Sequence, residues 1–75
     1  MTLEEFIVKF ADQFEDTEID EISADTEFQE LDEWSSLIAL SVIVMANKEF
    51  QKEITGKEIK ACNSVRSLYE LIQNK

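Results

Sequence analysis

The segment EWSSLIALSVIVMANKEF, residues 33–50, restricts the fold more than any other part of this sequence. An acidic and aromatic pair precedes two serines, and a nearly uncharged apolar run follows them. Serine is favoured at helix N-termini because its hydroxyl accepts a hydrogen bond from a free backbone amide. Either Ser35 or Ser36 can supply that cap, so we predict a helix from Ser36 to Phe50.

The helix predicted over these residues has two apolar faces. One stripe is a good core face and comprises Ala39, Val42, Ile43, Ala46 and Phe50. The opposite stripe comprises Leu37, Leu40, Ser41, Val44, Asn47 and Lys48. A domain of three or four helices cannot easily cover both stripes, and an uncovered apolar helix face is typical of a binding surface. We therefore expect the second stripe to bind partners, unless a third helix or the preceding loop covers it.

A first helix is predicted over Leu3–Phe14. Thr2 and Glu5 form a capping box at its start. The apolar residues recur at helical spacing and form one core stripe, which comprises Leu3, Phe6, Ile7, Phe10 and Phe14.

Two shorter helices are predicted after the central one. The third spans Thr55–Cys62, where Thr55 and Glu58 form another capping box and Ile59 faces inward. The last spans Ser64–Gln73, with Ser64 as its N-cap. Its apolar face comprises Val65, Leu68, Tyr69 and Ile72.

A long acidic connection, Glu15–Ser35, joins the first helix to the central one. We expect its spaced apolar residues to attach it to the helices; they are Ile19, Ile22, Phe28 and Leu31. Loops of this length in small domains are commonly functional or mobile. The whole pattern predicts an all-α fold, a small four-helix bundle with a long loop between helices 1 and 2 and a short third helix.

The composition supports one helical domain over residues 1–75. The chain has no proline and a single glycine, which disfavours the hairpin turns of sheets. Its one cysteine cannot form an internal disulfide, which fits a cytoplasmic location. Residues 1–5 lack the features of a signal peptide, and the longest uncharged run, residues 34–47, is too short to span a bilayer.

Charge is unevenly distributed along the chain. The net charge is −10, and residues 1–34 contain thirteen acidic residues and one lysine, whereas residues 35–75 contain four acidic and six basic residues. Such a chain repels nucleic acid and anionic membrane surfaces and is attracted to basic protein surfaces, although acidity also serves solubility alone. We expect a monomer with protein partners, no nucleic acid and no stable membrane insertion.

The residue types present exclude most catalytic sites. There is no histidine, so Ser-His, Cys-His and His-metal arrangements are impossible. Cys62 has no base partner and is expected to be a small buried residue. Acidic residues between positions 16 and 27 follow EF-hand spacing, but Glu21 stands where that loop needs glycine. We therefore predict neither an enzyme nor a specific metal site.

With these elements in this order, the sequence resembles the acyl carrier protein family. The family's hallmark is Asp-Ser-Leu at the start of its second helix, often preceded by Trp, and the matching residues here are Trp34-Ser35-Ser36-Leu37. Residues 22–28, 46–50 and 64–68 also resemble the family's pattern. The resemblance spans essentially all 75 residues and implies the family's helical fold.

The resemblance implies a stand-alone acyl carrier protein. The family's modified serine corresponds to Ser36, which would bear a covalent 4′-phosphopantetheine arm whose thiol carries acyl groups as thioesters. A pantetheinyl transferase would attach the arm, and the other partners would be acyl-loading and acyl-processing enzymes of fatty-acid, polyketide or related biosynthesis. The residues expected to bind partners are Leu37, Leu40, Ser41, Val44, Asp32 and Glu33.

Departures from the family pattern leave two alternatives open. The hallmark Asp is Ser35 here, and helix positions that are often Glu in the family are Ser41, Asn47 and Lys48. The family's glycine before the motif is also missing. The alternatives are an aminoacyl or peptidyl carrier, and an unmodified protein-interaction module with a carrier-like fold.

Overall fold

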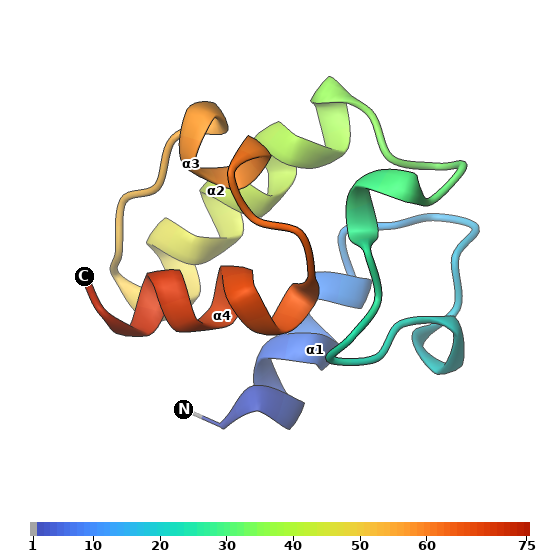
Figure 1. Cartoon of the computed structure of the whole chain (residues 1–75), viewed down its shortest axis with the longest axis horizontal. Coiled ribbons are helices and arrows are strands. Elements are labelled where there is room, and N and C mark those ends of the chain that lie inside the picture. The colour runs from blue at the N-terminus through green and yellow to red at the C-terminus, as the bar shows by residue number, and fades with distance from the viewer. Residues whose placement is uncertain (1) are drawn as a thin grey trace.

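The helices form where the caps and apolar stripes of the sequence place them. A computed structural model describes residues 2–75 (Figure 1). The elements in chain order are α1 (Leu3–Ala11), the 3₁₀ turns η1 (Ile19–Glu21) and η2 (Phe28–Glu30), α2 (Ser36–Phe50), α3 (Gly56–Lys60) and α4 (Val65–Gln73). No strand occurs in this described part of the chain. The prediction of an all-α bundle with a long first loop and a short third helix is confirmed.

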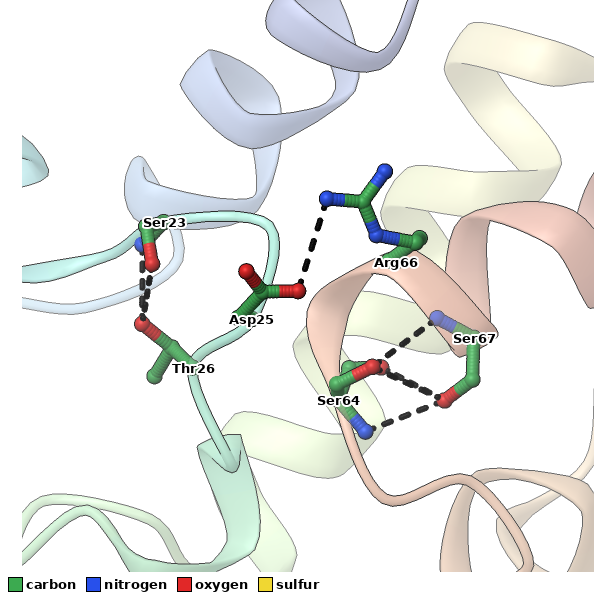
Figure 2. Close-up of polar contacts among 6 residues, drawn as sticks. All are labelled: Ser23, Asp25, Thr26, Ser64, Arg66 and Ser67. Carbon is green, nitrogen blue, oxygen red and sulfur yellow. Dashed lines mark hydrogen bonds and ion pairs between the residues drawn. The ribbon is translucent and has the colours of Figure 1, made fainter.

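Local capping fixes the helix starts. The Thr2 hydroxyl accepts from the Glu5 amide at 3.2 Å, and the Glu5 carboxylate accepts from the Thr2 amide at 3.0 Å, as predicted. Thr55 and Glu58 form the same reciprocal pair at α3. The start of α4 is capped by the Ser64 hydroxyl (Figure 2).

Two helices are shorter than predicted. α1 ends at Ala11 rather than Phe14, because the amides of Gln13 and Phe14 bond to carbonyls three residues back and tighten the chain into a turn. Phe14 is nevertheless buried, so its spacing predicted its burial correctly and its helical state wrongly. α3 ends at Lys60 rather than Cys62 for the same reason, because the Cys62 amide bonds to the carbonyl of Ile59.

Aromatic rings occupy the centre of the core. Phe6, Phe10 and Phe28 are fully buried. The ring of Phe28 lies 5.5 Å from that of Phe10 and 4.9 Å from that of Trp34, centroid to centroid, and both contacts are edge-on. Such pairs stabilise by about 0.5–1.5 kcal/mol beyond the burial of their area. These contacts join α1, the long connection and the residue just before the serines.

The helices surround this cluster. α1 contacts both α2 and α4, and α3 contacts α2. Figure 1 shows the long connection on the side of the molecule opposite the C-terminus. Within residues 2–75, no helix combines the length and apolar character needed to cross a membrane.

The long connection is ordered by backbone contacts with the start of α4. The carbonyls of Thr26 and Ala24 accept hydrogen bonds from the amides of Val65 and Arg66 at 3.1 and 2.8 Å. First-turn amides have no partner inside their own helix, so the connection supplies the partners that α4 lacks. The Arg66 guanidinium also lies 3.4 Å from Asp25 (Figure 2). Two segments that resemble the family pattern, residues 22–28 and 64–68, therefore bind one another.

Three of the four apolar residues expected to attach the connection do so. Ile22 and Phe28 are buried, and Leu31 is half-buried against the core. The expectation is wrong for Ile19, which is 47% exposed. Ile19 begins η1, a turn with no buried residue, which is closed instead by a hydrogen bond from the Glu18 amide to the Glu21 carboxylate.

Candidate functional site

Ser35 caps α2. Its backbone is extended, at φ −155° and ψ 173°, and its hydroxyl accepts from the Ile38 amide at 3.4 Å. Its carbonyl accepts the first helical hydrogen bond, from Ala39 at 2.9 Å. The sequence allowed either serine to be the cap, and the structure assigns the role to Ser35.

Ser36 is the first residue of α2 and is exposed. Across residues 2–75, no side-chain or backbone group forms a hydrogen bond with its hydroxyl. The amides of Ser36 and Leu37 precede Ala39, whose amide is the first to donate a helical hydrogen bond, and they point out of the helix start. Together with the helix dipole, they favour an anionic substituent at this position by about 0.3–1 kcal/mol. The first turn of α2 contains no acidic side chain that would compete for these amides.

Trp34 fixes the position of the two serines. Its ring stacks on Phe10 at a centroid distance of 6.3 Å and meets Phe28 at 4.9 Å. Its amide donates to the Leu31 carbonyl at 3.0 Å. The residue before the serines is therefore half-buried against the core, and this packing positions the start of α2.

Glu33 joins the two ends of the long connection. Its carboxylate accepts from the amides of Glu15, Asp16 and Thr17 at 2.7, 3.1 and 2.9 Å, and from the Thr17 hydroxyl at 2.8 Å. The Glu15 amide, followed by the Thr17 hydroxyl, holds the pKa of Glu33 below its ordinary value. We expected Glu33 to lie at a partner surface. Its carboxylate instead accepts hydrogen bonds from within the chain. The residue also borders a cleft near Leu37, which is described below.

Replacing Glu33 with Gln should lower the stability of the fold at neutral pH. A group whose pKa is lowered by folding stabilises the folded state above its unfolded pKa, near 4.3, and loses that contribution as the pH falls through the folded value. The difference in unfolding free energy between wild type and Glu33→Gln should therefore shrink on acidification. Urea unfolding at neutral pH and below about pH 4 measures it. The matched control, Glu30→Gln, removes an exposed carboxylate without hydrogen bonds within residues 2–75; if its loss equals that of Glu33→Gln, the interpretation is wrong.

The second apolar stripe of α2 is uncovered. Leu37, Leu40 and Val44 are 75%, 59% and 55% exposed, and we call these three residues the exposed face. Ser41 is half-buried beside it, and Asp32 is exposed before the helix. The expectation that this stripe faces solvent is confirmed, since neither α3 nor the long connection covers it.

Shallow clefts border the exposed face. One of about 290 Å³ is formed partly by Glu33, Leu37 and Ser41. On the core side of α2, the two-stripe interpretation missed Met45, which is 5% exposed although it was assigned to neither stripe.

A larger cleft of about 600 Å³ opens directly beside Ser36. One wall is α2, with Ser36, Ala39 and Ile43, and the other wall is α3, which contributes Ile59 and Lys60. No sequence pattern predicted this cleft, because it depends on where the short α3 lies against α2. We call it the α2–α3 cleft.

Gln29 holds the α3 wall in place. Its side-chain amide donates to the carbonyls of Cys62, Ile59 and Lys60 at 2.7, 3.2 and 3.3 Å. These carbonyls end a helix and lack partners within it. A residue of η2, thirty positions earlier in the chain, therefore caps the C-terminus of α3.

The remaining titratable candidates have structural roles. Cys62 is buried as expected, and burial raises the pKa of its thiol. The acidic run with EF-hand spacing forms η1 at residues 19–21 and not a binding loop. Within residues 2–75, no three or more acidic, cysteine or histidine side chains gather as a metal site.

Comparison with known proteins gives one finding. A family model described as "Phosphopantetheine attachment site" matches residues 5–72. No curated protein and no solved structure matches the chain. The matched range includes all of α2 and α3, and with them both serines and both walls of the α2–α3 cleft.

Proposed function

The chain belongs to the phosphopantetheine attachment family, the family of acyl carrier proteins, and on that premise we propose that its covalent 4′-phosphopantetheine is attached to Ser36. The contrast between two adjacent serines carries the proposal. The Ser35 hydroxyl accepts a hydrogen bond from the Ile38 amide, whereas the Ser36 hydroxyl is exposed and bonds to nothing within residues 2–75. An incoming enzyme can therefore reach Ser36 without disturbing the cap.

The residues around Ser36 fit the phosphate of the arm. A phosphodiester there lies at the positive end of a fifteen-residue helix, next to the free amides of Ser36 and Leu37. When attached, the arm supplies a terminal thiol on which acyl groups are carried as thioesters. Ser36 itself needs no activation by this chain, since a separate transferase acts on it.

The attachment reaction needs no general base from this protein. The Ser36 oxygen forms a bond to phosphorus, the phosphoanhydride bond of coenzyme A breaks, and adenosine bisphosphate leaves. The hydroxyl proton passes to the transferase. This assignment agrees with the absence of histidine from the sequence, because the serine is a substrate and not a catalyst.

We further propose a stand-alone acyl carrier that serves fatty-acid, polyketide or related biosynthesis. The α2–α3 cleft supports an acyl cargo, because its walls include the apolar residues Ala39, Ile43 and Ile59. Its volume of about 600 Å³ lies within the usual range of small-molecule sites.

Partner enzymes are proposed to dock on the exposed face. Leu37, Leu40 and Val44 offer an apolar strip, and Asp32 and Glu33 add negative charge near Ser36. A partner with an apolar groove and basic residues at one end would match this surface. So small a patch favours fast and weak binding, which suits a carrier that visits several enzymes.

Mass spectrometry of the intact protein tests the proposed function. After incubation with coenzyme A and a broad-specificity pantetheinyl transferase, the wild-type chain should gain the mass of one phosphopantetheine. A reaction without coenzyme A is the control. If several transferases and the native host all leave the chain unmodified, while it forms a stable complex through Leu40 and Val44, the chain is an interaction module and the proposal is wrong.

A further inference from the structure

The charge of the α2–α3 cleft is opposite to that of the molecule. The chain has seventeen acidic and seven basic residues, yet among residues 2–75 no carboxylate lines the cleft, and Lys60 is the only charged side chain that does. Lys60 is exposed and forms no ion pair with any part of residues 2–75. The cleft beside Ser36 is therefore a locally positive site on a strongly negative protein.

The position of Lys60 is held by the rest of the structure. Its carbonyl accepts from the Gln29 side chain at 3.3 Å, and the neighbouring Ile59 is 1% exposed. The last turn of α3 is thus fixed between Gln29 and the core. The backbone that carries the Lys60 ammonium is anchored at the edge of the cleft, while no carboxylate of the described residues pairs with the ammonium itself.

From this arrangement we propose that Lys60 selects the charge of the cargo, so that the α2–α3 cleft accepts acyl chains that are neutral or end in a carboxylate and rejects cationic aminoacyl chains. The inference rests on the proposed attachment at Ser36, since the arm must begin at the mouth of the cleft. An apolar chain lies along Ala39, Ile43 and Ile59, on a lining that also includes Lys60, and a terminal group that reaches Lys60 meets its ammonium. A terminal carboxylate pairs with the ammonium there, whereas a terminal ammonium is repelled.

The size of the effect follows from the exposure of Lys60. Ion pairs at exposed positions change an equilibrium by about two- to fivefold, because water screens them. The ratio of cargo inside the cleft to cargo in solvent should therefore differ by about that factor between charged and neutral chains. The same screening means that the preference weakens as salt is added.

Three isosteric cargoes test the proposal. Hexanoyl-, adipoyl- and ω-aminohexanoyl-coenzyme A differ only at the far end of a chain of equal length, and a promiscuous transferase can load each onto the protein. Intact mass first reports whether the arm is attached, and a failure at that stage counts against the proposed function. Amide chemical shifts of Ile43 and Ile59, compared with the protein bearing the bare arm, then report whether the cargo occupies the cleft.

The expected order of shifts is adipoyl, then hexanoyl, then ω-aminohexanoyl, with about a two- to fivefold difference in cleft occupancy between a charged and the neutral cargo. Lys60→Gln should make the two charged cargoes equal, and Lys60→Glu should reverse their order. Lys57→Glu is the matched control, because Lys57 lies on the same helix and does not line the cleft. Equal shifts for all three loaded cargoes, or the same change in Lys57→Glu as in Lys60→Glu, would overturn the role of Lys60 and leave the attachment at Ser36 standing.

Discussion

Ser36→Ala is expected to gain no mass with coenzyme A and transferase, whereas Ser35→Ala is expected to gain one phosphopantetheine as the wild type does. The two serines are adjacent and chemically identical, so only their surroundings separate them. Ser35 Oγ accepts from the Ile38 amide, whereas Ser36 is exposed and its Oγ has no hydrogen-bond partner among residues 2–75. Ser36→Ala removes the attachment oxygen entirely. The expected effect is therefore a complete loss of the mass gain that the wild type shows.

Only Ser35→Ala, the variant that is still modified, should lose stability. Loss of a serine cap costs about 0.5–2 kcal/mol, so Ser35→Ala should unfold at lower urea concentration. The cap bond is long, at 3.4 Å, which places the cost toward the lower end. Alanine at position 36 removes no hydrogen bond and is a good helix former, so Ser36→Ala should be about as stable as wild type. If the folded Ser36→Ala variant still gains a phosphopantetheine, the assignment of the attachment site to Ser36 is wrong.

Phe28→Ala should strongly destabilise the fold. Phe28 is fully buried, and its ring contacts Phe10 and Trp34 at 5.5 and 4.9 Å. Replacing a buried phenylalanine with alanine costs about 3–5 kcal/mol. The free energy of unfolding of a domain of this size is roughly 4–11 kcal/mol in total. The variant should therefore be either largely unfolded or only marginally stable at room temperature. Circular dichroism with urea titration measures the change.

Ile19→Ala is the matched control for that prediction. Both residues lie in the long connection, and the sequence pattern predicted the same attaching role for both. Ile19 is 47% exposed, so its truncation should change stability by no more than about 0.5 kcal/mol. If the two variants lose similar stability, the connection is held by something other than the aromatic cluster.

Local signals in the sequence predicted the parts of the fold that depend on neighbouring residues. The bounds of α2 and the reciprocal caps at Thr2–Glu5 and Thr55–Glu58 were correct, because each involves groups within one helical turn. The end of α1 was wrong, because Phe14 continues the apolar spacing after the hydrogen bonds have tightened into a turn.

Contacts between distant segments could not be predicted in the same way. The carboxylate of Glu33 bonds to amides sixteen to eighteen positions earlier, and Gln29 bonds to carbonyls thirty or more positions later. Neither residue type is unusual for a surface loop, so no pattern marked them. The α2–α3 cleft was missed for the same reason, and with it the isolated charge of Lys60.

The two walls of the α2–α3 cleft differ in mechanical stiffness. The α2 wall continues into the aromatic cluster through Trp34, but α3 has only five residues, too few to be stable as a helix without outside support. That support comes from the burial of Ile59 in the core and from the side-chain amide of Gln29, which donates to three carbonyls at the end of α3. A guest too long or too wide for the cleft would therefore displace the compliant α3 side, and the rest of the bundle would keep its shape while the cleft dilates.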